Sequence, residues 1–130
     1  RAGIVAGQLH LRQIVEALKD EVLTIIFAKG AWHSLDRMAA TGAHGLGIDW
    51  CNTPQFARQQ AGDPVVLQGN FDPATLLAPI PEIEKSVKKM LDGFGGYKHI
   101  ANLGHGILPN VPVDHAKAFV NTVKEYTKKG

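Results

Sequence analysis

Four short apolar segments alternate with stretches of helical periodicity, and this order constrains the fold more than any other feature of the sequence. The apolar segments are continuous, as expected for strands that helices cover on both faces; they are residues 22–28, 45–49, 65–69 and 99–103. Apolar side chains recur at helical spacing in residues 11–18, 32–41, 53–62, 81–92 and 116–126. A helix followed by four strand–helix units predicts a parallel sheet with right-handed crossovers.

Two α/β architectures fit this order of elements. One is a small open sheet that stands alone, and the other is half of a TIM (β/α)8 barrel, which needs roughly 250 residues. A length of 130 residues is ordinary for one domain, but the first residue is Arg1 and not Met. If the barrel is correct, we expect the chain to begin partway into a longer protein.

Composition favours a folded domain and excludes several classes of protein. Hydrophobic residues make up 45% of the chain and charged residues 20%, which indicates a buried core. The longest apolar run, residues 22–28, is far shorter than the roughly 20 residues that cross a bilayer, so we expect no membrane association and no secretory leader. A net charge of +2 is too small for a nucleic-acid partner. The single cysteine, Cys51, excludes an intrachain disulfide and a multi-cysteine metal site, and it fits a reducing compartment such as the cytoplasm.

Glycine and polar residues collect directly after each apolar segment, where open sheets and barrels carry their functional groups. These stretches are residues 28–30, 49–52, 69–73 and 102–106. The strongest candidate is His105, because it lies between Gly104 and Gly106. The glycines allow a ligand to approach the backbone closely, and an imidazole suits proton transfer or binding of a carboxylate. A plain turn histidine is the equally weighted alternative.

The other candidates carry weaker signals. For Asn70 and Asp72 we favour turn and capping roles over pocket lining, whereas for Asp49 substrate binding and capping are equally supported. We favour a solvated side chain for Lys29 and a buried, inert thiol for Cys51. For the two tryptophans, Trp32 and Trp50, a place in a pocket wall and a place in the core are both open. Surface or packing roles are expected for the remaining five histidines, which are His10, His33, His44, His99 and His115. No glycine-rich phosphate-binding fingerprint follows a strand, so the sequence predicts no cofactor.

Four strings of residues carry a specific resemblance to a known family. They are Ile-Ile-Phe-Ala-Lys-Gly at 25–30, Gly-Ile-Asp-Trp at 47–50, Leu-Gln-Gly-Asn-Phe-Asp-Pro at 67–73 and His-Ile-Ala-Asn-Leu-Gly-His-Gly-Ile at 99–107. In order and spacing, nearly the whole chain resembles the C-terminal part of the uroporphyrinogen decarboxylase family.

The resemblance implies a single-domain (β/α)8 barrel whose strands five to eight are the units seen here. Residues 1–130 would then be one partial domain, the C-terminal half of that barrel. The implied enzyme is a carboxy-lyase that removes the four acetate carboxyl groups of uroporphyrinogen III and gives coproporphyrinogen III in haem and chlorophyll synthesis. The reaction needs no cofactor, because a protonated pyrrole accepts the electrons released as carbon dioxide leaves. The resemblance also implies a cytoplasmic homodimer with facing clefts.

Among the residues of this chain, the resemblance assigns an active-site role to His105 alone, in hydrogen bonding a substrate carboxylate and, as an additional role, in donating a proton. The other main groups of the family are an aspartate, N-terminal arginines, a tyrosine and a serine, and these belong to the first half of the barrel. No matching motif occurs here, and their roles are not transferred to Asp49, Asp72, Arg12 or Tyr126. We therefore predict that this polypeptide alone is inactive.

Two alternatives from other classes remain. A related barrel family contains zinc- and thiol-dependent methyltransferases, which need a His-x-Cys pair and a later cysteine. The chain has one cysteine and no such pair, which disfavours this function. A non-catalytic α/β module that binds an anionic ligand through the loop at His105 is the second alternative.

Overall fold

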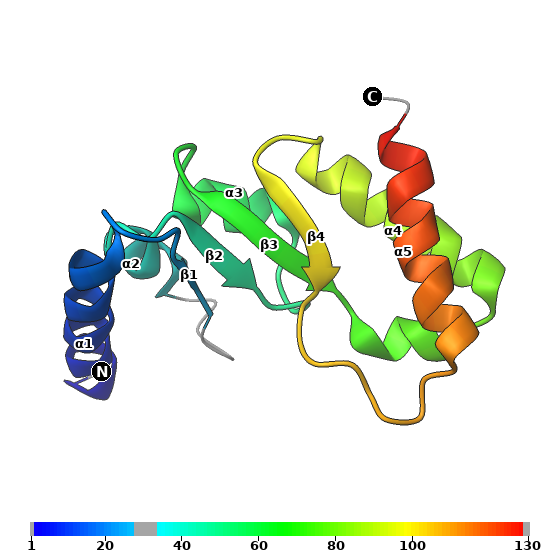
Figure 1. The fold of residues 1–130 in the computed structure, drawn as a ribbon, viewed down its shortest axis with the longest axis horizontal. Helices are drawn as coiled ribbons and strands as arrows, with labels where there is room; N and C mark the ends of the chain where they lie inside the picture. The colour runs from blue at the N-terminus through cyan, green and yellow to red at the C-terminus, as the bar shows by residue number, and fades with distance from the viewer. Residues whose placement is uncertain (1, 28–33, 129–130) are drawn as a thin grey trace.

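The computed structural model describes residues 2–27 and 34–128, and it confirms the alternation of strands and helices (Figure 1). The elements in chain order are α1 (Ala2–Leu18), β1 (Ile25–Ile26), α2 (Leu35–Ala39), β2 (Gly45–Ile48), α3 (Pro54–Ala61), β3 (Val66–Phe71), the 3-10 helix η2 (Pro73–Leu77), α4 (Ile80–Phe94), β4 (His99–Leu103) and α5 (Val113–Thr127). The predicted Lys29, Trp32 and His33 lie outside the described residues.

The strands form one parallel sheet in the order β1-β2-β3-β4, as predicted. Helices α3 and α4 cover one face of this sheet, and α5 packs beside α4 (Figure 1). The core between sheet and helices contains the almost fully buried Leu46, Ile48, Leu67, Ile83 and Val87. The last two are one helical turn apart on α4, so the amphipathic pattern identified the face that packs against the sheet.

Capping residues explain where helix α3 begins and where helix α4 ends. The hydroxyl of Thr53 accepts a hydrogen bond from the Phe56 N–H at 3.1 Å, and Pro54 occupies the first turn of α3. Helix α4 runs past residue 92, the predicted end of the periodic stretch, to Phe94, and Gly95 forms its C-cap with a φ of 67°. Gly93 instead lies against Pro54, since a Cβ atom there would be 2.8 Å from the proline Cγ.

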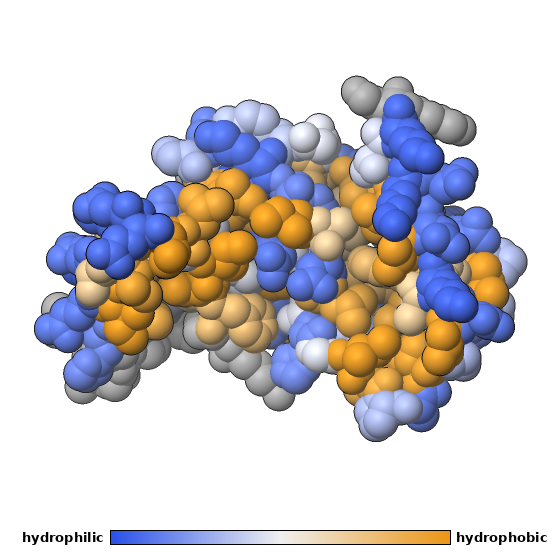
Figure 2. Space-filling model, in the orientation of Figure 1, coloured by the Kyte–Doolittle hydropathy of each residue, from blue (hydrophilic) through white to orange (hydrophobic). Residues whose placement is uncertain are grey.

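The second face of the sheet is open in the described residues, and this corrects the expectation that helices cover both faces. Ile25, Phe27 and Ile100 are on this face and are 45%, 47% and 43% exposed. Gly47 lies under the Phe27 ring, because a Cβ atom there would be 2.7 Å from Cδ2 of the ring. Figure 2 shows apolar residues gathered over β1 and β2 on the face toward the viewer.

Candidate functional site

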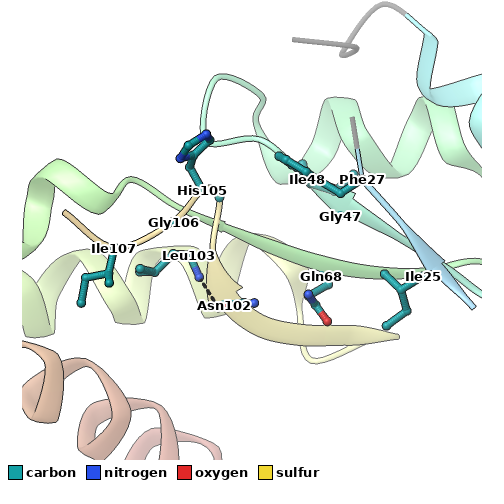
Figure 3. Close-up of a pocket in the computed structure, with 11 residues that line it drawn as sticks. Ile25, Phe27, Gly47, Ile48, Gln68, Asn102, Leu103, His105, Gly106 and Ile107 are labelled. Atoms are coloured by element: carbon teal, nitrogen blue, oxygen red, sulfur yellow. Dashed lines mark hydrogen bonds between the residues drawn. The ribbon is translucent and has the colours of Figure 1, made fainter. Parts of the chain in front are cut away.

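A pocket of about 640 Å³ lies on the open face, where the sheet meets the loop after β4 (Figure 3). Apolar groups on its wall include Phe27 and Ile107, and the polar side chains are those of Gln68, Asn102 and His105. A pocket at the carboxyl ends of parallel strands is the usual position for a binding site in such folds.

His105 is exposed and projects from the loop that follows β4 (Figure 3). The preceding residue, Gly104, packs so closely that a Cβ atom would be 2.5 Å from the Trp50 N atom. Its N–H also donates to the carbonyl oxygen of Phe71 at 2.7 Å. The backbone beside His105 is therefore fixed, while the imidazole makes no hydrogen bond to any described residue and is available to a ligand.

Asn70 lies at the end of β3 and not in the following loop, because this strand extends two residues beyond its predicted end at residue 69. Its side chain is only 8% exposed. The amide nitrogen donates to the carbonyl oxygens of Asn52, at 2.5 Å, and of Asp49, at 3.4 Å. Asn70 thus connects β3 to the loop that follows β2.

The two aspartates act as local capping groups. One Asp72 carboxylate oxygen accepts from the Ala74 N–H at 2.9 Å and caps η2, as favoured from the sequence. An Asp49 oxygen accepts from the Cys51 N–H at 3.3 Å, which is the capping alternative for this residue. These hydrogen bonds shape the loops around the pocket, and neither aspartate lines it.

Cys51 is exposed, so the prediction of a buried thiol is wrong. The turn after β2 directs Asn52 inward instead, with 8% of its surface exposed and its amide nitrogen without a described hydrogen-bond partner. Desolvation and then the negative charge of Asp49 raise the pKa of the Cys51 thiol. A raised pKa lowers the fraction of thiolate, which is the nucleophilic form of cysteine.

Three further histidines take the packing roles that we expected. The His99 ring stacks on Phe94 with a centroid separation of 3.8 Å and lies 2.6 Å from the Gly69 carbonyl oxygen, and burial lowers its pKa. His44 and His115 lie at hydrogen-bonding distance from Thr24 and from the Leu76 carbonyl, at 3.0 and 2.6 Å. None of the three lines the pocket, and His10 is exposed on α1.

Sequence reasoning missed Gln68 and assigned Asn102 only to a polar stretch after a strand, whereas both residues line the pocket from inside β3 and β4. They lie on the open face because successive side chains of a strand point to opposite faces. A two-residue periodicity would have identified them, but the segments were treated as continuous. In the described residues, no group of three His, Cys, Asp or Glu side chains is arranged for a metal ion, and no helix is long and apolar enough to span a membrane.

A parallel sheet with helices on one face, an open inner face and a pocket at its carboxyl end defines four consecutive units of a TIM (β/α)8 barrel. A methyltransferase from Methanosarcina mazei has a similar fold, with a TM-score of 0.78 and 23% identity over 92% of this chain and 35% of that protein. The family model described as uroporphyrinogen decarboxylase (URO-D) matches residues 8–126. The chain belongs to the uroporphyrinogen decarboxylase family.

Curated relatives agree with this assignment. Proteins named uroporphyrinogen decarboxylase from Flavobacterium johnsoniae and Christiangramia forsetii are 54% and 55% identical to the chain over 117 residues, which is 90% of its length. A protein of the same name from Yersinia enterocolitica is 45% identical over 125 residues. The chain spans about a third of the length of these relatives, 34% for the first two and 35% for the third.

Proposed function

We propose that this chain is the C-terminal part of a uroporphyrinogen decarboxylase, with residues 1–130 as one partial domain of its barrel. The complete enzyme would remove the four acetate carboxyl groups of uroporphyrinogen III and release coproporphyrinogen III. The observation that carries the proposal is the exposed imidazole of His105, held by a closely packed glycine at the edge of the pocket. Membership of the family and the names of the relatives support it.

His105 has the chemistry that binding of an acetate group requires. An imidazole N–H donates a hydrogen bond to a carboxylate, which orients the bond between the methylene carbon and the carboxyl carbon. When that bond breaks, its electron pair moves into the protonated pyrrole and carbon dioxide leaves. A proton then adds to the methylene carbon, which becomes a methyl group, and the ring releases the proton that it had taken up, so that each acetate exchanges one carbon dioxide for one proton. His105 can also supply a proton, and Phe27 and Ile107 form an apolar wall of the same pocket.

The proposal includes a cytoplasmic homodimer with facing clefts for the complete protein. Its support is the family resemblance and, for the compartment, the single cysteine. Light scattering on the purified complete protein tests the dimer, and a mass equal to one subunit would contradict it.

A chimera tests the proposed function directly. In the Flavobacterium johnsoniae decarboxylase, the 117 aligned residues are replaced by the matching residues of this chain. We expect the chimera to convert uroporphyrinogen to coproporphyrinogen, measured by chromatography of the oxidised porphyrins. A folded chimera without turnover would contradict the proposal.

Substitutions of His105 in this chimera test its role. We expect His105→Ala to lower turnover by about a hundredfold, the lower range for loss of a proton-transfer group. His10→Ala is the matched control, because His10 is exposed on α1 and outside the pocket, and it should leave turnover unchanged. His105→Gln retains a hydrogen-bond donor but cannot transfer a proton, so it separates the two roles. Turnover of His105→Ala equal to that of the unmodified chimera would remove His105 from the mechanism.

A further inference from the structure

The loops after β2, β3 and β4 are joined by a continuous set of contacts at the carboxyl end of the sheet. The first contact is made by the Asn70 amide, which donates to two carbonyl oxygens of the loop after β2, those of Asp49 and Asn52. The same loop is closed internally, since the Asn52 N–H donates to the Asp49 carbonyl oxygen at 3.2 Å. Asn70 therefore determines where this loop lies relative to β3.

The second contact joins this loop to the residue before His105. Gly104 packs on the backbone of Asp49 and Trp50 so closely that a Cβ atom built on it would lie 3.1 Å from the Asp49 carbonyl carbon and 2.5 Å from the Trp50 nitrogen. The Gly104 N–H donates to the carbonyl oxygen of Phe71, the residue that follows Asn70. A shift of the loop after β2 would therefore displace Gly104, and His105 is bonded to it.

We propose that Asn70 is a positioning residue for His105, because its buried amide holds the loop of residues 49–52 against which the Gly104 backbone packs. Two hydrogens on one nitrogen serve two carbonyl acceptors, an arrangement that the neutral amide provides and an ionised carboxylate does not. The inference rests on the proposed function for its effect on catalysis, but its geometric part does not depend on the identity of the substrate.

Asn70→Asp is the sharpest variant, because a carboxylate has nearly the same shape but cannot donate when ionised. It would face two carbonyl oxygens at a buried position, and the loop would move away. Asn121→Asp on α5 is the matched control, since the Asn121 side chain is exposed and does not line the pocket. If Asn70→Asp does not fold, Asn70→Ser takes its place, because it removes the amide without adding a charge. The positioning role is then tested on this variant with the same two measurements.

The experiment uses the complete chimera with two independent readouts. The first is turnover, for which we expect a fall in kcat of about ten- to a hundredfold with a smaller change in KM, because Asn70 does not line the pocket. The second is the NMR signal of the His105 ring in protein labelled at histidine Cε1, assigned by its loss in His105→Ala. We expect this signal to shift in the Asn70 variant and to stay in place in Asn121→Asp, while the His10 signal stays in place in both.

These readouts separate the two proposals. A chimera without turnover would overturn the proposed function, and the NMR signal would still test the positioning of His105. A His105 signal that does not move in a folded Asn70 variant would overturn the positioning role, even if turnover fell. A shift in Asn121→Asp as large as that in the Asn70 variant would overturn it as well.

Discussion

At the scale of single residues, close approach of backbone segments is the feature that most restricts this site. Gly69 has a φ of +127°, and a Cβ atom there would be 2.5 Å from the Ile48 carbonyl oxygen. It therefore allows β2 and β3 to meet directly below the loops that surround the pocket. Its conformation is one that residues with a side chain rarely adopt.

We predict that Gly69→Ala lowers the free energy of unfolding of the chimera by at least about 2 kcal/mol, from backbone strain together with the clash at Ile48. Gly106→Ala is the control for stability, since no atom lies within 4 Å of a Cβ built there and its φ is not in the left-handed region. It should change the free energy by less than about 1 kcal/mol. Urea unfolding measures both, and equal effects of the two variants would contradict the prediction.

At the scale of elements, prediction succeeded where a structure depends on local pattern. The buried face of α4 follows from the helical spacing of apolar residues, which was predicted for residues 81–92, and the Thr53 cap of α3 follows from side-chain chemistry. The positions of Asn70 and Cys51 were not, because they depend on how far β3 extends and on how the chain turns after β2. Long-range pairing and loop packing decide those two features, and neither has a signature within a few residues.

We predict that Ile83→Ala on α4 lowers the free energy of unfolding of the chimera by about 2–5 kcal/mol, since the side chain is fully buried between helix and sheet. Lys85→Ala on the exposed side of the same helix is the control and should stay within about 0.5 kcal/mol. Urea unfolding at constant pH provides the comparison. An effect of Ile83→Ala as small as that of Lys85→Ala would show that this face does not support the sheet.

At the scale of the whole molecule, the main feature is the open inner face of the sheet, which leaves the pocket incomplete although the strands and helices are in place. A closed barrel buries both faces of its strands, whereas here Ile25, Phe27 and Ile100 are exposed in the described residues. The pocket with His105 is correspondingly open on one side. The family and the parallel order of the strands were predictable from short strings and from periodicity, and the position of His105 relative to its neighbours required the structure.

We predict that the isolated chain of 130 residues does not decarboxylate uroporphyrinogen. The substrate is highly anionic, and a net charge of +2 spread over the chain does not replace a cluster of arginines. The measurement is turnover of the isolated chain beside that of the chimera at equal concentration. Comparable rates would mean that the site is complete within these residues.

Because Cys51 is exposed, a spectroscopic label can be attached to its thiol close to the site. It is the single cysteine of the sequence, and it lies in the same turn as the carbonyl oxygen that accepts from Asn70. In the isolated chain, a maleimide-linked fluorophore or spin label would attach at this one thiol. Because its pKa is raised, labelling is slow near neutrality and becomes faster as the pH rises and the thiolate fraction increases. The turn beside His105 therefore carries its own reporter position, from which the arrival of a ligand can be followed in real time.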